Sequence, residues 1–415
     1  MEHRTDDLWT GGPWEQPARP VPPSRRRYPT AGRPVLRVRR RRSWLRVLAA
    51  LALAALLCAG ALGVGGQLFL LWQYGGPGGD PIVQQEEDST LPPAIRRAET
   101  GTGVTVDLKA AAGEPLAYDQ IYGKNVVSMV SIRAESDKTV SSGTGIILTE
   151  DGYLITNAHV VAGADRVQAV FWNNRAAQVE LVGFNAGEDL AVLKADVTGL
   201  TPAEFGSSDA LHCGDPVAAL GDPLGYRSSI TDGIVSALDR DVSMGGGRTM
   251  QLIQTSAAIN FGNSGGALIN QYGQVVGVTT IKIVARDGST ESMGFAIPSV
   301  RVKYVVDRLI AGEPVRTAAL GITVSTVQTD EGGLEVLLVD ANSDAAAQGI
   351  RPGDVLKEVN GQTITGADVL RRLKLTMAPG DTVTLTWSRD GQSRTAQIAM
   401  MDADDIGAER SNDNT

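Results

Sequence analysis

QTSAAINFGNSGGALIN, residues 254–270, places Ser264 among glycines directly before a short apolar run. A serine hydroxyl is a poor nucleophile until a base removes its proton. It also needs backbone N–H groups aimed at the negative charge that develops on a substrate oxygen. Glycine on both sides of Asn263-Ser264 lets the backbone turn tightly enough for the N–H groups of Gly262 and Ser264 to point into one pocket. The stretch therefore predicts a nucleophilic serine beside an oxyanion hole.

A base and a carboxylate are needed to activate such a serine, and the sequence offers a candidate for each. His159 ends a strand-like segment in TNAHVV (156–161), at the kind of strand-to-loop junction where catalytic groups are displayed. Asp189 opens DLAVLK (189–194), directly before an apolar strand, where its side chain can be held partly buried. We expect His159 to act as the base and Asp189 to orient it.

Each of these signals has a plainer interpretation when it stands alone. The glycine-rich run could be an ordinary turn, His159 a structural histidine and Asp189 a surface acid at a strand start. Their order along the chain, His then Asp then Ser, is chymotrypsin-like and differs from the subtilisin and α/β-hydrolase orders. The neighbours His212 and Cys213 do not suggest a metal site, because such a site needs three or four convergent ligands. We predict no metal and no cofactor.

The pattern between 116 and 312 consists of short strands separated by turns, which is typical of an all-β sandwich or barrel. A helix is expected at 299–311, followed by Gly312. A smaller α+β unit spans 317–401, with helical patterns at 343–349 and 366–377. The predicted strands of the first unit lie at 126–132, 144–148, 153–157, 166–172, 178–184, 190–195, 216–220, 251–255 and 275–281.

Five motifs in order resemble the HtrA (Deg) family of serine proteases: TNAHVV, DLAVLK, GDPLGYRSSITDGIVSALDR (221–240), the Ser264 stretch and MGFAIP (293–298). The resemblance implies a mostly β fold with two six-stranded, trypsin-like barrels and the roles already given to His159, Asp189, Ser264 and Gly262. It also makes Ile259 part of the specificity pocket, with plain core packing as the alternative.

The chain departs from the family pattern at two positions near this site. Phe261 stands where the family usually has Pro or Arg, and Glu188 stands where it often has Asn. Neither departure removes a predicted catalytic group. Phe261 does bear on the resting conformation of the oxyanion loop.

The C-terminal unit resembles a PDZ domain in ALGI (319–322) and IRPGDVLKEVNGQTI (350–364), although ALGI alone could be an ordinary strand start. In such domains loop N–H groups capture a C-terminal carboxylate while the peptide adds a strand to a sheet edge. The resemblance assigns the loop to Leu320, Gly321 and Ile322. Val369 and Leu373 would face the groove from the helix.

Residues 47–72 form a charge-free run of 26 residues, and a membrane-spanning helix needs about 20 apolar residues. The basic tail 1–46, with 12 arginines, precedes this run, so we expect the N-terminus in the cytoplasm and the rest outside. A cleaved signal peptide with small residues at 59–61 is the alternative. Because the basic tail adjoins this span, we do not expect nucleic-acid binding.

The complete predicted organisation has six parts. The two cysteines, Cys58 in the span and Cys213 outside, cannot pair, so the outer domains depend on packing. In order, the parts are a disordered tail (1–46), a transmembrane helix (47–72), a linker (73–115), the protease domain (116–312), the PDZ-like domain (317–401) and a disordered acidic tail (402–415).

We expect a membrane-anchored, extracytoplasmic serine endopeptidase that degrades unfolded or damaged proteins in quality control. The resemblance implies this substrate class and a trimeric assembly. Two alternatives stay open: a site-specific signalling protease acting on a membrane or envelope protein, and a non-catalytic peptide-binding scaffold or chaperone. An intact set of His159, Asp189 and Ser264 argues against the scaffold.

Overall fold

The computed structural model describes residues 90–407 apart from 138, 222–228, 246–247, 261 and 283–292. The predicted basic tail, the transmembrane helix and Phe261 lie outside the described residues, as do the first part of the linker and the end of the acidic tail. Within the part that is described, no helix is long and apolar enough to cross a bilayer.

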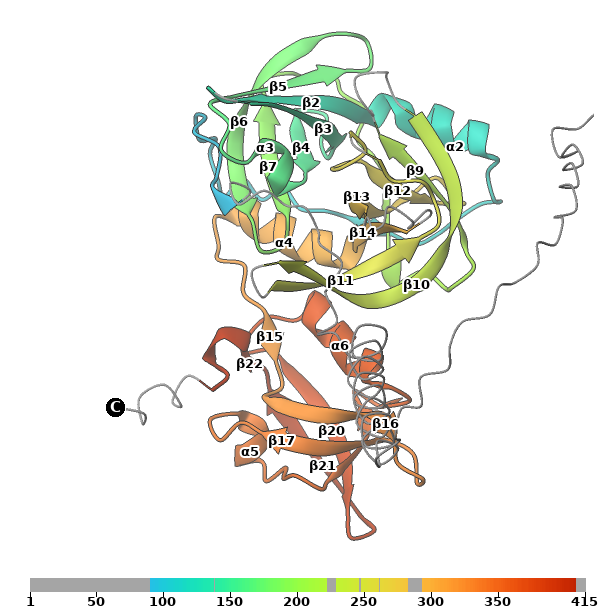
Figure 1. Ribbon diagram of the computed structural model, residues 1–415, viewed down its shortest axis with the longest axis vertical. Coiled ribbons are helices and arrows are strands. Elements are labelled where there is room, and N and C mark those ends of the chain that lie inside the picture. Colours follow the sequence, from blue (N-terminus) through green and yellow to red (C-terminus); the bar gives the residue numbers. More distant parts are fainter. Residues whose placement is uncertain are drawn as a thin grey trace, which may run out of the picture. The chain divides into compact units, whose positions relative to one another are not determined.

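The first barrel is a closed ring of six strands in the order β2-β3-β4-β7-β6-β5 (Figure 1). Its strands are rich in β-branched residues, which suit a pleated sheet. Side chains such as Ile132, Leu154 and Leu193 are fully buried in a core of their own. The strands are β2 (Met129–Glu135), β3 (Val140–Ile147), β4 (Tyr153–Thr156), β5 (Arg166–Phe171), β6 (Ala176–Asn185) and β7 (Leu190–Ala195).

The second barrel also has six strands, in the order β13-β12-β9-β10-β11-β14, and closes through pairing of β13 with β14. Two short strands, β1 (Leu108–Lys109) and β8 (Phe205–Gly206), pair in parallel and extend this sheet beside β13. The predicted mostly β fold with two six-stranded barrels is therefore confirmed. The strands are β9 (Pro216–Gly221), β10 (Ser229–Gly245), β11 (Arg248–Thr255), β12 (Ala267–Asn270), β13 (Val275–Lys282) and β14 (Gly294–Pro298).

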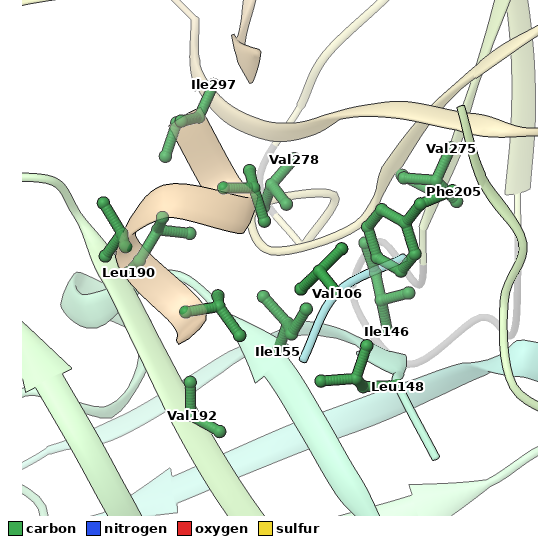
Figure 2. Packing of buried hydrophobic residues seen from close by; sticks show 14 of the residues in the cluster. Val106, Ile146, Leu148, Ile155, Leu190, Val192, Phe205, Val275, Val278 and Ile297 are labelled. Carbon is green, nitrogen blue, oxygen red and sulfur yellow. The ribbon is translucent and has the colours of Figure 1, made fainter. Parts of the chain in front are cut away.

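One continuous apolar core joins the two barrels. Figure 2 shows Ile146 and Leu190 from the first barrel packed in the same cluster as Val278 and Ile297 from the second. Val106, which precedes both barrels in the chain, lies in this cluster and is completely buried. Burial of apolar surface is the main favourable contribution to folding, so the two barrels stabilise each other.

Residues 91–109, called here the N-terminal strap, lie along both barrels although the sequence suggested a linker there. The strap contacts the first barrel, then helix α4 (Ser299–Ala311) and finally strand β8 through β1. This part of the predicted linker is thus a packed part of the fold. Its hydrogen bonds include Gly163 N to Leu91 O (3.0 Å), Leu181 N to Arg96 O (2.8 Å), Gly101 N to Ile310 O (2.7 Å) and Val106 N to Asp307 Oδ1 (2.7 Å).

Helix α4 (Ser299–Ala311) coincides with the predicted helix, and Gly312 ends it in the left-handed conformation that glycine tolerates best. Its first residue, Ser299, donates to Gly206 O (2.6 Å) and accepts from Ser208 N (2.8 Å), so its hydroxyl ties the helix to β8. The other short helices here are α2 (Tyr118–Asn125), η2 (Val126–Ser128), α3 (Ala158–Val161) and η3 (Ser208–Ala210).

The C-terminal domain is a sheet in the order β16-β17-β18-β20-β21 with β19 beside β18, accompanied by helices α5 and α6. Strand β16 lies at the sheet edge, and residues such as Leu356, Leu385 and Trp387 form a separate core. Its elements are β15 (Ala318–Ala319), β16 (Ile322–Gln328), β17 (Leu334–Val339), α5 (Asp344–Ala347), β18 (Val355–Val359), β19 (Gln362–Thr363), α6 (Ala367–Thr376), β20 (Thr382–Arg389), β21 (Gln392–Ala399), β22 (Met401–Asp402) and η5 (Ala403–Asp405).

Candidate active site

His159 and Asp189, the predicted base and acid, lie in direct contact. The Nδ1 atom of His159 is 2.9 Å from both carboxylate oxygens of Asp189, and the His159 backbone N–H donates to Asp189 Oδ1 (3.1 Å). His159 lies on the single turn α3 directly after β4, and Asp189 directly precedes β7, which pairs with β4. Strand pairing therefore brings the two together over 30 residues of chain.

Asp189 is almost completely buried, 2 % exposed, and further bonds fix it. The hydroxyl of Thr280 donates to Asp189 Oδ2 (2.5 Å), and Asn157 Nδ2 donates to the Asp189 carbonyl (2.9 Å). Asp189 has a φ of 50°, in the left-handed region that aspartate tolerates better than most residues. The contacts of Thr280 and Asn157 were not predicted from the sequence, although both residues lie in predicted strands or motifs.

The pKa of His159 is raised above its ordinary value. Burial by itself lowers this pKa, because it disfavours the charged imidazolium. The negative charge of Asp189 and its hydrogen bond to the ring outweigh burial. The Asp189 carboxylate thus makes His159 a stronger base than an isolated imidazole in the same place would be.

The loop that carries Ser264 is held between the two barrels. Gly262 and Gly265 have φ of 95° and 81°, where a side chain is strained. A Cβ atom on Gly265 would lie 2.2 Å from Thr144 O. Thr144 in β3 donates its hydroxyl to Gly262 O (2.6 Å) and its N–H to Ser264 O (2.8 Å), and Thr279 in β13 donates its hydroxyl to the carbonyl of the intervening Asn263 (2.6 Å).

Ser264 Oγ donates to the carbonyl of Thr280 (3.0 Å). Among the described residues no hydrogen bond joins this hydroxyl to His159. Thr280 is thus a shared neighbour: its carbonyl accepts from Ser264 while its hydroxyl holds Asp189. Ser264 and the His159–Asp189 pair therefore adjoin through Thr280, and the serine hydroxyl is turned toward the Thr280 carbonyl. Catalytic hydrogen bonds are often unformed in proteins without substrate.

Gly262 and Ser264 are the predicted oxyanion donors. Their backbone N–H groups donate no hydrogen bond to another described residue. Ile259, predicted to shape the specificity pocket, is 3 % exposed and packs with Ala219 and Ala257 in a small cluster. A Cβ atom on Gly294 would lie 2.4 Å from Ile259 Cγ1, so the isoleucine also fills the space above a glycine of β14.

The residues predicted for a peptide groove lie together in the C-terminal domain. Leu320 and Val369 are buried in its core, and Ile322 and Leu373 are half-buried against the same cluster. Gly321 has a φ of 68° directly before the edge strand β16, and helix α6 lies beside that strand. The loop, the edge strand and the helix therefore occupy adjacent places.

The chain is similar to known proteins over both of its folded domains. The family described as trypsin-like peptidase domain matches residues 143–278, and the PDZ domain family matches residues 318–400. A serine protease Do-like HtrA of Lactobacillus helveticus is 36 % identical over 313 residues, covering 70 % of this chain and 76 % of its own. The serine protease PepD of Mycobacterium tuberculosis is 37 % identical over 315 residues, covering 71 % and 68 %.

The fold is also similar to solved structures. The HtrA-type protease AlgW, solved with a tripeptide, has a TM-score of 0.56 and 30 % identity, and the similarity covers 69 % of this chain and 97 % of that one.

Proposed function

Because the chain belongs to the HtrA family of trypsin-like serine proteases with a C-terminal PDZ domain, we propose that it is an endopeptidase that cleaves unfolded or damaged proteins outside the cytoplasmic membrane. The observation that supports the catalytic assignment best is the contact of His159 with the buried Asp189, 2.9 Å from both carboxylate oxygens. The Ser264 loop adjoins this pair through Thr280.

In the proposed mechanism Ser264 Oγ attacks the carbonyl carbon of the scissile peptide bond while His159 Nε2 takes the hydroxyl proton. The N–H groups of Gly262 and Ser264 stabilise the resulting oxyanion. The imidazolium then donates its proton to the leaving amine, and the C–N bond breaks to give an acyl-enzyme. A water molecule, deprotonated by His159, hydrolyses the ester and restores Ser264.

A fluorophosphonate probe tests this assignment, because it reacts only with an activated serine. We expect the full-length protein to be labelled and Ser264→Ala to lose both labelling and turnover of a denatured protein, by several orders of magnitude. Ser393→Ala, which removes an exposed hydroxyl in β21, serves as the control and keeps both. Labelling of Ser264→Ala at the original rate would contradict the assignment.

Substrate class needs a separate measurement. We expect the protein to cleave a denatured globular protein at many sites and to spare the same protein when it is folded. We expect the Ser264→Ala variant to retain a varied set of envelope proteins. Retention of one membrane protein cut at one site would favour a signalling protease. Peptide binding without labelling by the probe would favour a scaffold.

The PDZ domain is proposed to bind peptides that end in an apolar residue with a free carboxylate. Charge-assisted hydrogen bonds are about twice as strong as neutral ones, so amidating the peptide should weaken binding sharply. Calorimetry with the acid and the amide on the whole protein decides this, and equal affinities would rule out carboxylate capture. Gly321 variants are a poorer test, since a Cβ atom there would lie 2.3 Å from Ser343 Cβ and 2.7 Å from Met401 Sδ.

The proposed location rests on the sequence of residues 47–72 and the arginines before it. Protease added outside intact spheroplasts should digest the chain beyond residue 75 and spare the N-terminal tail. Protection of the catalytic domain would overturn this orientation. The family resemblance also implies a trimer, which sedimentation of the detergent-solubilised protein would reveal.

A further inference from the structure

A buried arginine, Arg301 in α4, is 4 % exposed and makes a bidentate ion pair with Glu188. Its Nε atom is 2.9 Å from Glu188 Oε2 and its Nη2 atom is 2.5 Å from Oε1. This paired geometry fixes the carboxylate in direction as well as in distance. Glu188 is the residue directly before Asp189, so the pair anchors the turn from which the predicted catalytic acid projects.

The turn itself is one that needs support. Asp189 has a φ of 50°, outside the regions that most residues prefer, and such conformations persist where the surroundings hold them. On one side of the turn, Glu188 N–H donates to Asn185 Oδ1 (2.8 Å), and on the other, Asn157 holds the Asp189 carbonyl. Arg301 adds the anchor to the Glu188 side chain.

The same guanidinium is fixed by groups outside the catalytic barrels. Its Nη1 atom donates to Lys374 O (2.8 Å) at the end of α6, and its Nη2 atom is 3.3 Å from Thr317 Oγ1. The last four carbonyls of a helix have no partner within the helix, so Arg301 satisfies one of them. The guanidinium also lies over the Tyr304 ring, 4.6 Å from its centroid. Arg301 is therefore held from several sides.

We propose that Glu188 and Arg301 are positioning residues for Asp189, which hold its carboxylate in the orientation that keeps the His159 imidazole in place. This inference rests on the proposed catalytic role of Asp189. Neither residue touches the imidazole or the substrate; the effect passes through the backbone of the turn. Helix α6 takes part because its Lys374 carbonyl fixes the guanidinium that fixes Glu188.

The test compares Arg301→Gln, Arg301→Lys and Glu188→Gln with Arg308→Gln in the full-length protein. Arg308 is a matched control on the same helix: its guanidinium lies 3.8 Å from the centroid of the same Tyr304 ring, and its hydrogen bond goes to Tyr304 O (3.5 Å). Misplacement of a catalytic group by about 1 Å can cost about a hundredfold. We expect kcat to fall about ten- to a hundredfold in Arg301→Gln and Glu188→Gln, with KM within about twofold.

A second readout separates positioning from general stability. If the carboxylate shifts away from the ring, the pKa of His159 falls, and the acid limb of the kcat/KM profile moves to lower pH. Arg301→Lys keeps the positive charge but cannot make the two parallel hydrogen bonds to Glu188. Its kcat should therefore lie between that of the wild type and that of Arg301→Gln. The double variant should lose no more than the worse single variant, because the pair acts as a unit.

The outcomes that overturn the inference are equally specific. An unchanged acid limb, or loss of activity only in step with loss of the folded fraction in a melting curve, would make the pair merely structural. Should Arg301→Gln fail to fold, Glu188→Gln and Arg301→Lys decide the matter. In every active variant the probe should still label Ser264, so failure of this inference differs from failure of the proposed function, in which Ser264 is not labelled at all.

Discussion

At the scale of the residue, Asp189 shows how a buried carboxylate is held by hydrogen bonds to both of its oxygens. Its oxygens accept hydrogen bonds from the backbone and ring of His159 and from the Thr280 hydroxyl. Buried charges are tolerated when they are paired and hydrogen-bonded. The same bonds direct the carboxylate at one nitrogen of the imidazole, which leaves the other nitrogen for the serine.

The raised pKa of His159 gives the first prediction, because the base acts only when it is neutral. Activity should therefore fall as the pH falls through that pKa, with a kcat/KM midpoint above the ordinary value of about 6.5. Asp189→Asn removes the negative charge that raises the pKa of His159, so an NMR titration of the ring should give a lower pKa than in the wild type. An unchanged titration would show that Asp189 does not set the pKa.

The same shift has a consequence for stability, and its sign is fixed by linkage. Because the pKa is raised in the folded state, the contribution of the His159–Asp189 pair is fully present below the unfolded pKa of about 6.5. It is lost as the pH rises through the folded pKa.

Thr280 gives a second prediction at this scale. Thr280→Val keeps the shape and removes the hydroxyl that holds Asp189 Oδ2. Hydrogen bonds to charged groups contribute about 1.5–3 kcal/mol, so kcat/KM should fall by about tenfold or more. Thr280→Ser keeps the hydroxyl and should keep most of the activity. Equal rates for the valine and serine variants in a peptide-cleavage assay would contradict the role given to the hydroxyl.

At the scale of the element, the sequence predicted most strands of the protease domain but missed the longest. Strand β10 (Ser229–Gly245) has no continuous apolar run, and it depends on pairing with β9 and β11, with register shifts against β11. Conversely, the beginning of the predicted strand 126–132 forms the turn η2 (Val126–Ser128), and β2 starts at Met129. An apolar pattern alone does not separate a strand from a short helical turn.

The site was predictable where residue type and order carry the information. His159, Asp189 and Ser264 each lie in a motif whose chemistry requires that residue. The contacts of Thr144, Thr280 and Arg301 could not be read from the chain, because a threonine or an arginine fits many places. Their contacts depend on which elements become neighbours in the fold. Strands β3 and β13 lie beside the serine loop, and helix α4 lies beside the turn before β7.

The IRPGD segment before β18 gives a prediction for the PDZ domain. Asp354 is 1 % exposed and accepts two hydrogen bonds from Arg389 in β20, at 2.6 and 2.7 Å, and one from Arg351 N–H. Breaking a buried pair by removing one partner costs about 3–5 kcal/mol, so Asp354→Asn should lower the melting temperature of this domain markedly. Asp390→Asn, in the exposed turn after β20, is the control and should have little effect.

The pH dependence of that pair has the opposite sign to that of His159. Burial acts to raise the pKa of Asp354, but the hydrogen bonds from Arg389 and the Arg351 backbone outweigh it, and the pKa is lowered. The stabilisation is therefore present above the unfolded pKa of about 3.9 and is lost as the pH falls through the folded one. If Asp354→Asn and the wild type differed equally in melting temperature at neutral and strongly acidic pH, this account would fail.

At the scale of the whole molecule, the two barrels are joined by the shared core and by the N-terminal strap. Val106 in the strap is completely buried in that core. Val106→Ala removes two carbon atoms and leaves a cavity, which should cost about 1–3 kcal/mol of unfolding free energy. Val104→Ala, a half-buried neighbour two residues away, should cost less. Denaturant unfolding followed by tryptophan fluorescence measures both, and an unchanged unfolding free energy in Val106→Ala would show that the strap does not stabilise the core.

The direction in which the strap crosses the molecule gives the protease domain a mechanical polarity. From Leu91 the strap contacts the first barrel, and only later does it reach α4 and β8. A pulling force applied at the N-terminal end should therefore break the hydrogen bonds between the strap and the first barrel one after another. The buried Val106 and the short parallel β1–β8 pair bear load last. Pulling a single molecule from residue 90 should give a small extension at low force before either barrel opens, so the strap would act as a yielding tether that protects the catalytic barrels from tension.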